Sequence, residues 1–333
     1  MPEPIERNLG FELVRATEAA ALNAARWMGK GERNAADQAA VDAMRYVLGS
    51  VEMDGVVVIG EGEKDEAPML YIGEGVGTGR PPTADLAVDP IDGTRLLAHG
   101  LPGSISVVAL AKRHALYAPK HIVYAHKLVV GHEAAGAIDL DASATTNLRA
   151  IAAAKRCGVD DLTVVVLDRP RHAELVADIR RAGARIKLIS DGDVAAGVAA
   201  ALADTGVDVL MGVGGAPEAV ITACAVKALG GDMQCKPYAR DDAERARAEA
   251  AGVDFGRVLL LEDLVRGDDV FFAATGITSG ELLGGVRFFG GGAHTSSLII
   301  RGKSGTIRRL ESTHDLRKLQ QISSLGYTVT DGG

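Results

Sequence analysis

The segment AVDPIDGT, residues 87–94, places two carboxylates three residues apart across a proline. Asp89 and Asp92 can converge on one side of such a turn, while Gly93 lets the backbone approach a ligand closely. Thr94 adds a hydroxyl two positions further on. Oxygen ligands of this kind suit Mg²⁺ or Mn²⁺, which commonly bridge to a substrate phosphate. An ordinary Asp-Pro turn is the alternative, so this motif alone leaves the choice open.

A second group of acids, in the run GEGEKDEAP at 60–68, directly follows an apolar strand expected at 56–59. Crowded carboxylates repel one another, and when desolvated they raise one another's pKa unless a cation neutralises them. An acidic loop in solvent is the alternative. Glu61 is favoured as a metal ligand because it comes first after the strand and stands between two glycines. A surface or supporting role is left to Glu63, Asp65 and Glu66.

Two further acids become candidate metal ligands only when they are considered together with the acids named above. Asp37 is expected in the first turn of a helix at 34–48, and Glu218 follows Pro217, the expected first residue of another helix. Acids near the start of a helix stabilise it through the helix dipole, so each one alone indicates helix stabilisation.

Strands and helices alternate through the second half of the chain. Strands are predicted at 163–167, 184–189 and 207–211, and helices at 172–182, 194–204 and 218–229. This alternation predicts an α/β fold with a largely parallel, helix-covered sheet and right-handed crossovers. Ligands in such sheets bind beyond the carboxyl ends of the strands. Those ends carry Arg169-Pro170-Arg171, Asp191-Gly192-Asp193 and a glycine-rich run at 212–215.

The groups at these strand ends suit a phosphorylated sugar. The guanidinium groups of Arg169 and Arg171 can hold a phosphate by paired hydrogen bonds, and Asp191 can accept hydrogen bonds from sugar hydroxyls. A solvated turn is the alternative for the arginines, and a helix cap is the alternative for Asp193.

Further elements are predicted in the rest of the chain. A strand at 86–88 is expected to end at Asp89-Pro90, because proline cannot continue a strand ladder. A helix is predicted at 240–252, strands at 270–274 and 298–300, and a loosely held tail from about Leu310. We divide the chain at residue 150, into an N-terminal α+β metal-binding half (1–150) and a C-terminal α/β half (151–333) that binds sugar phosphate. The two halves are expected to pack tightly.

Composition excludes several classes of partner. The chain has 36 Lys plus Arg against 44 Asp plus Glu and a formal charge of -8, which provides no basic surface for nucleic acid. Its three cysteines are scattered, so neither a disulfide framework nor a zinc site is expected. The N-terminus lacks the basic and apolar pattern of a signal peptide, and no apolar run is long enough to span a bilayer. These features predict a cytoplasmic protein without membrane partners.

Eight segments spread over nearly the whole chain share their order with one known family. They are GKGERNAADQAAVDAMR, VVIGEGEKDEAPMLYIGEGVGTGR, AVDPIDGTR, DRPRH, ISDGDVAAG, GVGGAPEAVITA, ATGIT and LIIRGKSGTIRR. The chain therefore resembles class II fructose-1,6-bisphosphatase, from about Phe11 to Leu310. That family belongs to the metal-dependent, lithium-sensitive phosphatases with a layered α/β/α/β/α architecture.

The resemblance implies roles for individual residues. It assigns one divalent metal, Mn²⁺ or Mg²⁺, to Asp37 and Glu61, and another to Asp89, Asp92 and Glu218. Thr94 is implied to orient the attacking water, with Asp89 and Glu61 as further catalytic groups. The implied substrate contacts are Asp92, Gly93 and Thr94 at the reacting phosphate, Tyr124, Arg169, Pro170 and Arg171 at the distal phosphate, and Asp191, Gly192, Asp193 and Gly215 around the sugar.

One residue departs from the family pattern. The turn usually reads Asp-Pro-Ile-Glu-Gly-Thr, whereas Asp92 stands here in place of the glutamate, with a carboxylate one methylene shorter. The implied activity is hydrolysis of fructose 1,6-bisphosphate to fructose 6-phosphate in gluconeogenesis, by a homo-oligomer. A dual enzyme that also accepts sedoheptulose 1,7-bisphosphate and a non-catalytic sugar-phosphate sensor are the alternatives.

Overall fold

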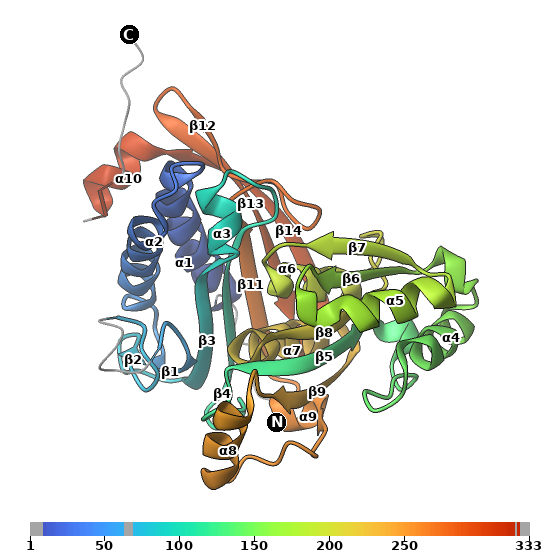
Figure 1. The fold of residues 1–333 in the computed structure, drawn as a ribbon. Helices are drawn as coiled ribbons and strands as arrows, with labels where there is room; N and C mark the ends of the chain where they lie inside the picture. The colour runs from blue at the N-terminus through green and yellow to red at the C-terminus, as the bar shows by residue number, and fades with distance from the viewer. Residues whose placement is uncertain (1–8, 63–68, 324, 327–333) are drawn as a thin grey trace.

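Two β-sheets and three layers of helices alternate through the molecule (Figure 1). The computed structural model describes residues 9–62, 69–323 and 325–326. The first sheet contains β1 (Asp54–Ile59), β2 (Gly75–Val76), β3 (Thr83–Asp92), β4 (Ile105–Lys112), β11 (Val270–Gly276), β12 (Arg287–Phe289), β13 (Gly292–Arg301) and β14 (Thr306–Asp315). The second contains β5 (Tyr124–Val130), β6 (Thr163–Leu167), β7 (Arg185–Ile189), β8 (Val209–Gly215), β9 (Asp232–Tyr238) and β10 (Leu259–Leu260).

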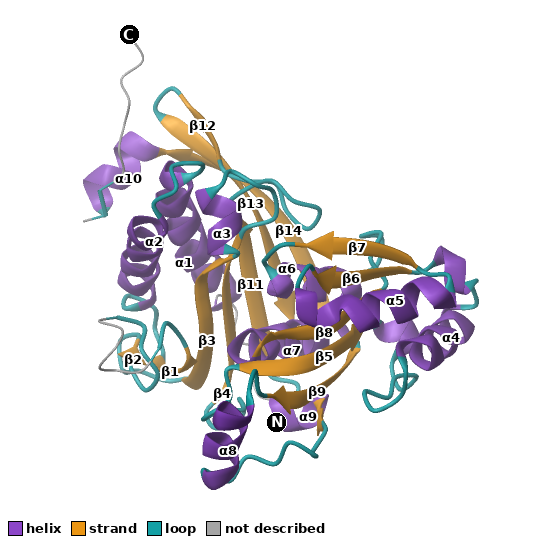
Figure 2. Cartoon of the chain, in the orientation of Figure 1, coloured by secondary structure: helices purple, strands orange, loops and turns teal. Residues whose placement is uncertain are grey.

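Helices cover both sheets and fill the space between them (Figure 2). The helices α1 (Leu9–Ala24) and α2 (Arg33–Leu48) pack on the outer face of the first sheet, and α4 (Ala144–Lys155) and α5 (Ala173–Ala182) on the outer face of the second. Between the sheets lie α6 (Asp193–Ala201) and α7 (Ala216–Leu229). This order of layers confirms the predicted α/β/α/β/α architecture.

The central helix α7 contacts strands of both sheets, including β4, β11, β5 and β9. Its sequence, APEAVITACAVKAL, is apolar on all sides, as expected of a helix that is buried all round. Ile221 and Cys224 are almost completely buried in its middle, and the acid Glu218 lies in its first turn. One end of the most buried helix therefore carries a carboxylate.

The second sheet combines parallel and antiparallel pairs. Its order is β10-β9-β5-β8-β6-β7, and β6 is parallel to both β7 and β8, as the alternation of strands and helices predicts. The strand β5 runs antiparallel to β8 and β9, and β10 is antiparallel to β9. The strand β9 is parallel to β8, with β5 between them, and α7 connects the two as a β-α-β unit whose second strand was not predicted. The strands β5 and β10 belong to no such unit, so the alternation of strands and helices gives no signal for them.

Three local predictions are corrected by the structure. The strand at Asp89 does not end at Pro90: β3 continues to Asp92, and its register with β4 shifts between Asp89 and Asp92. A proline is tolerated at such a bulge because its missing N–H is not needed there. The helix α2 begins at Arg33, which puts Asp37 in its second turn, and α7 begins at Ala216, one residue before Pro217.

The predicted loose tail is also wrong as far as residue 322. Leu310 lies within β14, which pairs with β13 along its whole length, and α10 (Leu316–Ile322) follows it directly. The remaining helices, α3 (Thr94–Ala98), α8 (Asp242–Ala250) and α9 (Leu261–Leu264), are short. Within the described ranges, no helix combines the length and apolar character that crossing a bilayer requires.

Candidate active site

The predicted metal-binding acids lie at the ends of neighbouring elements. The strands β1 and β3 are parallel partners, so their carboxyl ends meet at the same edge of the first sheet. Glu61 follows β1, and Asp89 and Asp92 lie in the last four residues of β3. Electrostatic interactions link Glu218 at the start of α7 to all three. The sequence positions 61, 89, 92 and 218 are therefore brought into one site.

The position of Glu61 depends on a close backbone contact. A Cβ atom at Gly60 would lie 2.0 Å from the carbonyl oxygen of Leu70, so no side chain fits there. The N–H of Glu61 donates to that same carbonyl at 3.0 Å, which holds the residue at the exit of β1. Although Glu61 remains exposed, its pKa is raised to about 7, first by desolvation and then by the charges of Asp37 and Glu218. The acids Glu63, Asp65 and Glu66 lie outside the described residues.

Asp89 and Asp92 are both held by backbone amides. The Oδ1 atom of Asp89 accepts from the N–H of Ile91 at 3.0 Å, and the Oδ2 atom of Asp92 accepts from the N–H of Ala195 at 3.1 Å, in the first turn of α6. Burial raises the pKa of both carboxyls well above the usual range. The charges of neighbouring acids, including Glu218, raise both values further. The site is therefore electrostatically unfavourable unless a proton or a cation occupies it.

Asp37 and Thr94 meet because the loop before α2 is fastened to α3. The N–H groups of Gly29 and Gly31 donate to the carbonyls of Leu97 and Ala98 at 2.9 and 3.0 Å. The Oγ1 atom of Thr94 then lies 3.1 Å from Oδ1 of Asp37 and 3.2 Å from the carbonyl of Ile91. Its single proton can serve only one of these acceptors at a time. Since Asp37 is in the second turn, its contact with Thr94 explains its position better than the helix dipole does.

Glu218 provides an oxygen without a partner. Its side chain folds back over Gly215, where a Cβ atom would lie 1.8 Å from Oε2. Within the described part of the chain, Oε2 is buried and accepts no hydrogen bond. Burial raises the pKa of Glu218, and the ammonium of Lys127 opposes the rise. A buried carboxylate oxygen that lacks a donor is a natural ligand position for a cation.

The donor set fits a hard divalent cation. All five candidate ligands are carboxylates, as Mg²⁺ and Mn²⁺ prefer, and Glu218 contributes the unpartnered oxygen. Among the described residues, however, no three acidic, histidine or cysteine side chains converge closely enough to hold a metal ion as they stand. The carboxylates therefore form no closed ligand shell as they stand, and their side chains would have to move to complete one.

The rim of the second sheet gathers an aromatic ring and two arginines. Tyr124 begins β5, opposite Gly215 of β8 and Tyr238 of β9. The guanidinium groups of Arg171 and Arg240 lie 5.4 and 5.5 Å from the centroid of the Tyr124 ring. No sequence pattern indicated Arg240, since it lies in the loop just after β9 and belongs to no recognised motif. Arg169 instead turns back and donates to the carbonyl of Asp168 at 3.0 Å, and Pro170 begins a short 3₁₀ turn.

The aspartates after β7 have different environments. The Oδ2 atom of Asp191 accepts from the N–H of Arg95 at 3.2 Å, which connects the second sheet to α3. Gly192 has φ of 78° and lies against Leu96. Asp193 is buried, and its Oδ2 atom accepts from Nζ of Lys127 at 2.7 Å. Lys127, also buried, is a second group for which local sequence gives no signal, because its partner lies 66 positions away.

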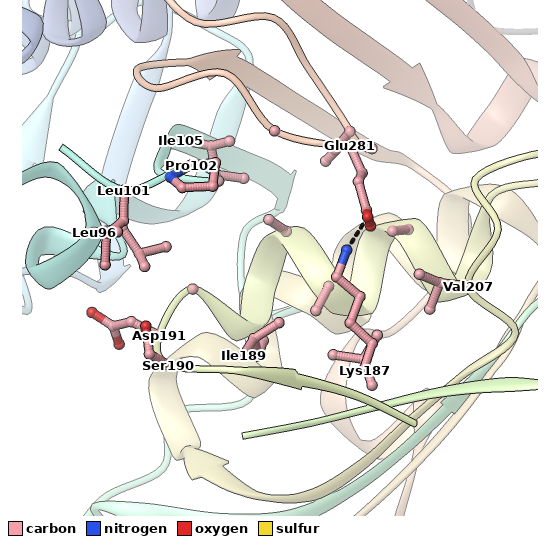
Figure 3. Close-up of a pocket in the computed structure, with 18 of the residues that line it drawn as sticks. Leu96, Leu101, Pro102, Ile105, Lys187, Ile189, Ser190, Asp191, Val207 and Glu281 are labelled. Atoms are coloured by element: carbon pink, nitrogen blue, oxygen red, sulfur yellow. Dashed lines mark ion pairs between the residues drawn. The ribbon is translucent and has the colours of Figure 1, made fainter. Parts of the chain in front are cut away.

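A cavity of about 550 Å³ adjoins these residues (Figure 3). Asp191 and Gly192 form part of its wall, and Leu96, Leu101 and Ile105 make much of the rest apolar. An ion pair between Lys187 and Glu281 spans it. None of the five candidate metal ligands lines this cavity, nor does Arg171. The cavity therefore lies beside the acids, whose pKa values burial and mutual repulsion raise.

The five-layer fold, the clustered carboxylates and the arginine-bearing rim are features of α/β phosphatases that act on sugar phosphates. The chain belongs to the family described as "Bacterial fructose-1,6-bisphosphatase, glpX-encoded", which matches residues 7–314. Relatives in Escherichia coli K12, E. coli O6:H1 and Shigella flexneri are each named a class 2 fructose-1,6-bisphosphatase. Each is 48% identical over 326 residues, which cover 94% of this chain and 96% of the relative.

The raised pKa of Glu61 predicts a pH-dependent loss of stability in metal-free protein. The folded state binds the Glu61 proton more tightly than the unfolded state, so stability falls as the pH rises from about 4.5 to about 7. Glu61→Gln removes this contribution. We expect the melting temperature of the variant to equal that of the original protein near pH 4 and to exceed it at pH 8. A constant difference across this range, measured by calorimetry in a chelating buffer, would contradict the assignment.

The buried pair of Lys127 and Asp193 predicts a large loss of stability when one partner is removed. The two side chains are 1% and 8% exposed, so Lys127→Met leaves an uncompensated buried carboxylate. We expect a loss of about 3–5 kcal/mol in urea unfolding. Lys236→Met, on the neighbouring strand, is the matched control: its pair with Asp141 is 24% and 57% exposed, and we expect a loss of about 1 kcal/mol or less. Equal losses would show that burial does not matter here.

Proposed function

We propose that this chain hydrolyses the phosphate ester at C1 of fructose 1,6-bisphosphate, giving fructose 6-phosphate and inorganic phosphate in gluconeogenesis. The observation that carries the proposal is the 48% identity, over nearly the whole chain, with proteins named class 2 fructose-1,6-bisphosphatases. The geometry supports it, because Glu218, which interacts with the other acids, folds over Gly215, and Gly215 pairs with Tyr124 of the arginine-bearing rim.

We assign two divalent cation positions to the acids. Asp37 and Glu61 would hold one ion, and Asp89, Asp92 and Glu218 the other. The chemistry supplied by bound Mg²⁺ or Mn²⁺ is neutralisation of the carboxylates and polarisation of the phosphoryl group. The unpartnered Oε2 atom of Glu218 supports this assignment. The shorter side chain of Asp92 fits as well, because the N–H of Ala195 fixes one of its oxygens and leaves the other available.

Thr94 is the residue we assign to orienting the attacking water. When its hydroxyl donates to Oδ1 of Asp37, at 3.1 Å, the oxygen lone pairs of Thr94 remain free. A water that donates to Thr94 then directs its own lone pair elsewhere, toward the phosphorus of a bound ester. Asp37 therefore fixes the direction of the Thr94 hydroxyl, and Thr94 fixes the direction of the water. Asp89 and Glu61 complete the reacting centre.

The two ends of the substrate would contact different elements. Asp92, Gly93 and Thr94 lie where β3 meets α3, next to the reacting phosphate in our proposal. The distal phosphate is assigned to Arg171 and Tyr124, which lie together, with Arg169 and Pro170 on the same turn. The sugar is assigned to Asp191, Gly192, Asp193 and Gly215. Because Asp193 is buried against Lys127, we assign it to shaping the pocket and Asp191 to contacting hydroxyls.

The proposal also covers the cellular compartment, the roles of the two halves of the chain and the oligomeric state. The free thiols Cys157, Cys224 and Cys235 support a reducing compartment, and we place the protein in the cytoplasm. Residues 1–150 supply four of the proposed metal ligands, whereas residues 151–333 supply Glu218 and most of the substrate contacts. We propose that these two halves work as one unit, in a homo-oligomer.

The test of function is phosphate release by purified protein from a panel of substrates, with and without Mg²⁺ or Mn²⁺. We expect metal-dependent release from fructose 1,6-bisphosphate and loss of nearly all of it in Asp89→Asn. Comparable release from sedoheptulose 1,7-bisphosphate would change the assignment to a dual enzyme. Binding of fructose 1,6-bisphosphate without any release would support a sensor and refute the proposal.

Two variants separate catalysis from substrate binding. Thr94→Ala should lower kcat about a hundredfold or more with little change in KM, because water orientation matters only in the chemical step. Arg171→Ala should raise KM about tenfold or more, since a charge-assisted hydrogen bond to phosphate is lost. Arg180→Ala, on the exposed face of α5, is the control and should change neither value. An Arg171→Ala variant with unchanged KM would refute its phosphate role.

A further inference from the structure

The strand β14 forms one edge of the first sheet. It pairs antiparallel with β13 over residues 306–315, and no other described strand pairs with it. An edge strand turns the N–H and C=O groups of every second residue outward, where they can bind another strand. Ten residues is long for an edge. The outer side of β14 therefore offers a long row of main-chain donors and acceptors.

Several of the usual protections of an edge strand are missing from β14. Native proteins prevent edge pairing with charged side chains, prolines, bulges, very short strands or a covering helix. The sequence TIRRLESTHD contains no proline, and its register with β13 has no shift. Its largest described contacts are with β13 and, at its end, α10, while Arg309 also reaches the carbonyl of Leu282 and His314 lies near Glu18 of α1. The charged side chains of β14 oppose pairing with a strand of like charge, but they favour a partner that places opposite charges against them.

We infer that β14 pairs antiparallel with β14 of a second copy of this chain, so that the first sheet continues across a two-fold axis. A second observation, in addition to the open edge, is the charge pattern of the strand. Arg309 and Glu311 are both exposed and lie on the same face, on either side of Leu310. This proposal concerns assembly only and does not depend on the proposed catalytic activity.

Symmetry restricts the register. In a symmetric antiparallel pair, one residue lies opposite its own copy, and its neighbours pair reciprocally. A centre at Arg309 would place two arginines face to face, and a centre at Glu311 would place two glutamates face to face. A centre at Leu310 puts Arg309 opposite Glu311 of the second copy, and Glu311 opposite Arg309. Opposite charges in directly facing positions stabilise a pair of strands, and like charges destabilise it.

The register centred on Leu310 also uses most of the strand. It runs from Thr306 opposite His314 to His314 opposite Thr306. The side chain of Ile307, which is 46% exposed, then lies opposite Thr313. Glu311 makes no hydrogen bond or ion pair within the described residues, and so it is available for this contact. Arg309 donates to the carbonyl of Leu282 at 3.0 Å with Nη1, which leaves its other guanidinium nitrogens available.

The test is a charge exchange read by sedimentation velocity. The original protein should contain dimers of about twice 34.5 kDa, or a larger assembly built from such dimers. Glu311→Arg places like charges opposite each other in two positions, and it should weaken the contact on the order of tenfold or more and halve the observed mass. The double variant R309E/E311R restores both opposite-charge pairs with the signs reversed and should restore the original mass.

Two controls keep this test specific. Arg308→Glu changes a charge one residue away but on the other face, opposite Ser312, and should leave the assembly intact. Circular dichroism and thermal melting of Glu311→Arg at a concentration where both proteins are monomeric should match the original protein, since Glu311 is exposed and makes no hydrogen bond or ion pair with the residues that the structure describes. Amide hydrogen exchange provides an independent measurement. Dilution to monomer should speed exchange at 306–315 and leave β13 protected.

Several outcomes would overturn the inference. A protein that is monomeric at concentrations of tens of micromolar has no such interface. An assembly whose mass Glu311→Arg does not change uses another surface. Loss of assembly in both Glu311→Arg and the double variant would refute the register centred on Leu310.

Discussion

The mutual repulsion of buried carboxylates is the constraint on which the rest of this structure depends. Asp89, Asp92 and Glu218 have raised pKa values because each is desolvated beside the others. Such a group of charges can persist only if the surrounding backbone prevents it from relaxing. The backbone amides of Ile91 and Ala195 and the close packing at Gly60 and Gly215 provide that restraint. Unfavourable electrostatic energy is therefore concentrated where we propose that a cation and a phosphate bind.

The five-layer fold is the means of holding these charges in place. The helix α7 packs between the two sheets, so the position of Glu218 is set by apolar contacts on every side of that helix. An N–H in the first turn of α6 donates to Asp92 and fixes it. Thr94 begins α3, and α3 is in turn hydrogen-bonded to the loop before α2. Each ligand thus depends on a different element, and the geometry of the site depends on how the layers pack.

Much of the fold could be predicted from local sequence patterns. The strand at 163–167 has the predicted bounds, and the α/β class followed from alternating strands and helices. The strand β14 was missed because its side chains are largely polar and exposed, so no apolar alternation marks it. The strands β5 and β9 were missed because their partners lie far away in sequence. Periodicity describes a single element, whereas sheet order depends on contacts between distant segments.

The residues of the candidate active site show the same difference between local sequence patterns and contacts made by distant segments. The segment at 87–94 and Glu61 could be singled out as candidate metal ligands from residue type and from their positions at the ends of strands, and the structure brings them together with Glu218. Asp37 and Glu218 could not be separated from helix stabilisation until the contact with Thr94 and the unpartnered oxygen were seen. Lys127 and Arg240 have no local signature, since Lys127 pairs with Asp193 at the start of α6 and Arg240 lies over the Tyr124 ring of β5, both far away in sequence.

The topology of the first sheet has a consequence for synthesis of the chain. The strand β4, from residues 105–112, has β3 on one side and β11, from residues 270–276, on the other. More than 150 residues separate β4 from β11, so during translation one edge of this largely buried strand stays unpaired until β11 has been synthesised. Chaperone contact, or early folding of the second sheet over that edge, would protect the nascent chain from aggregation in the meantime.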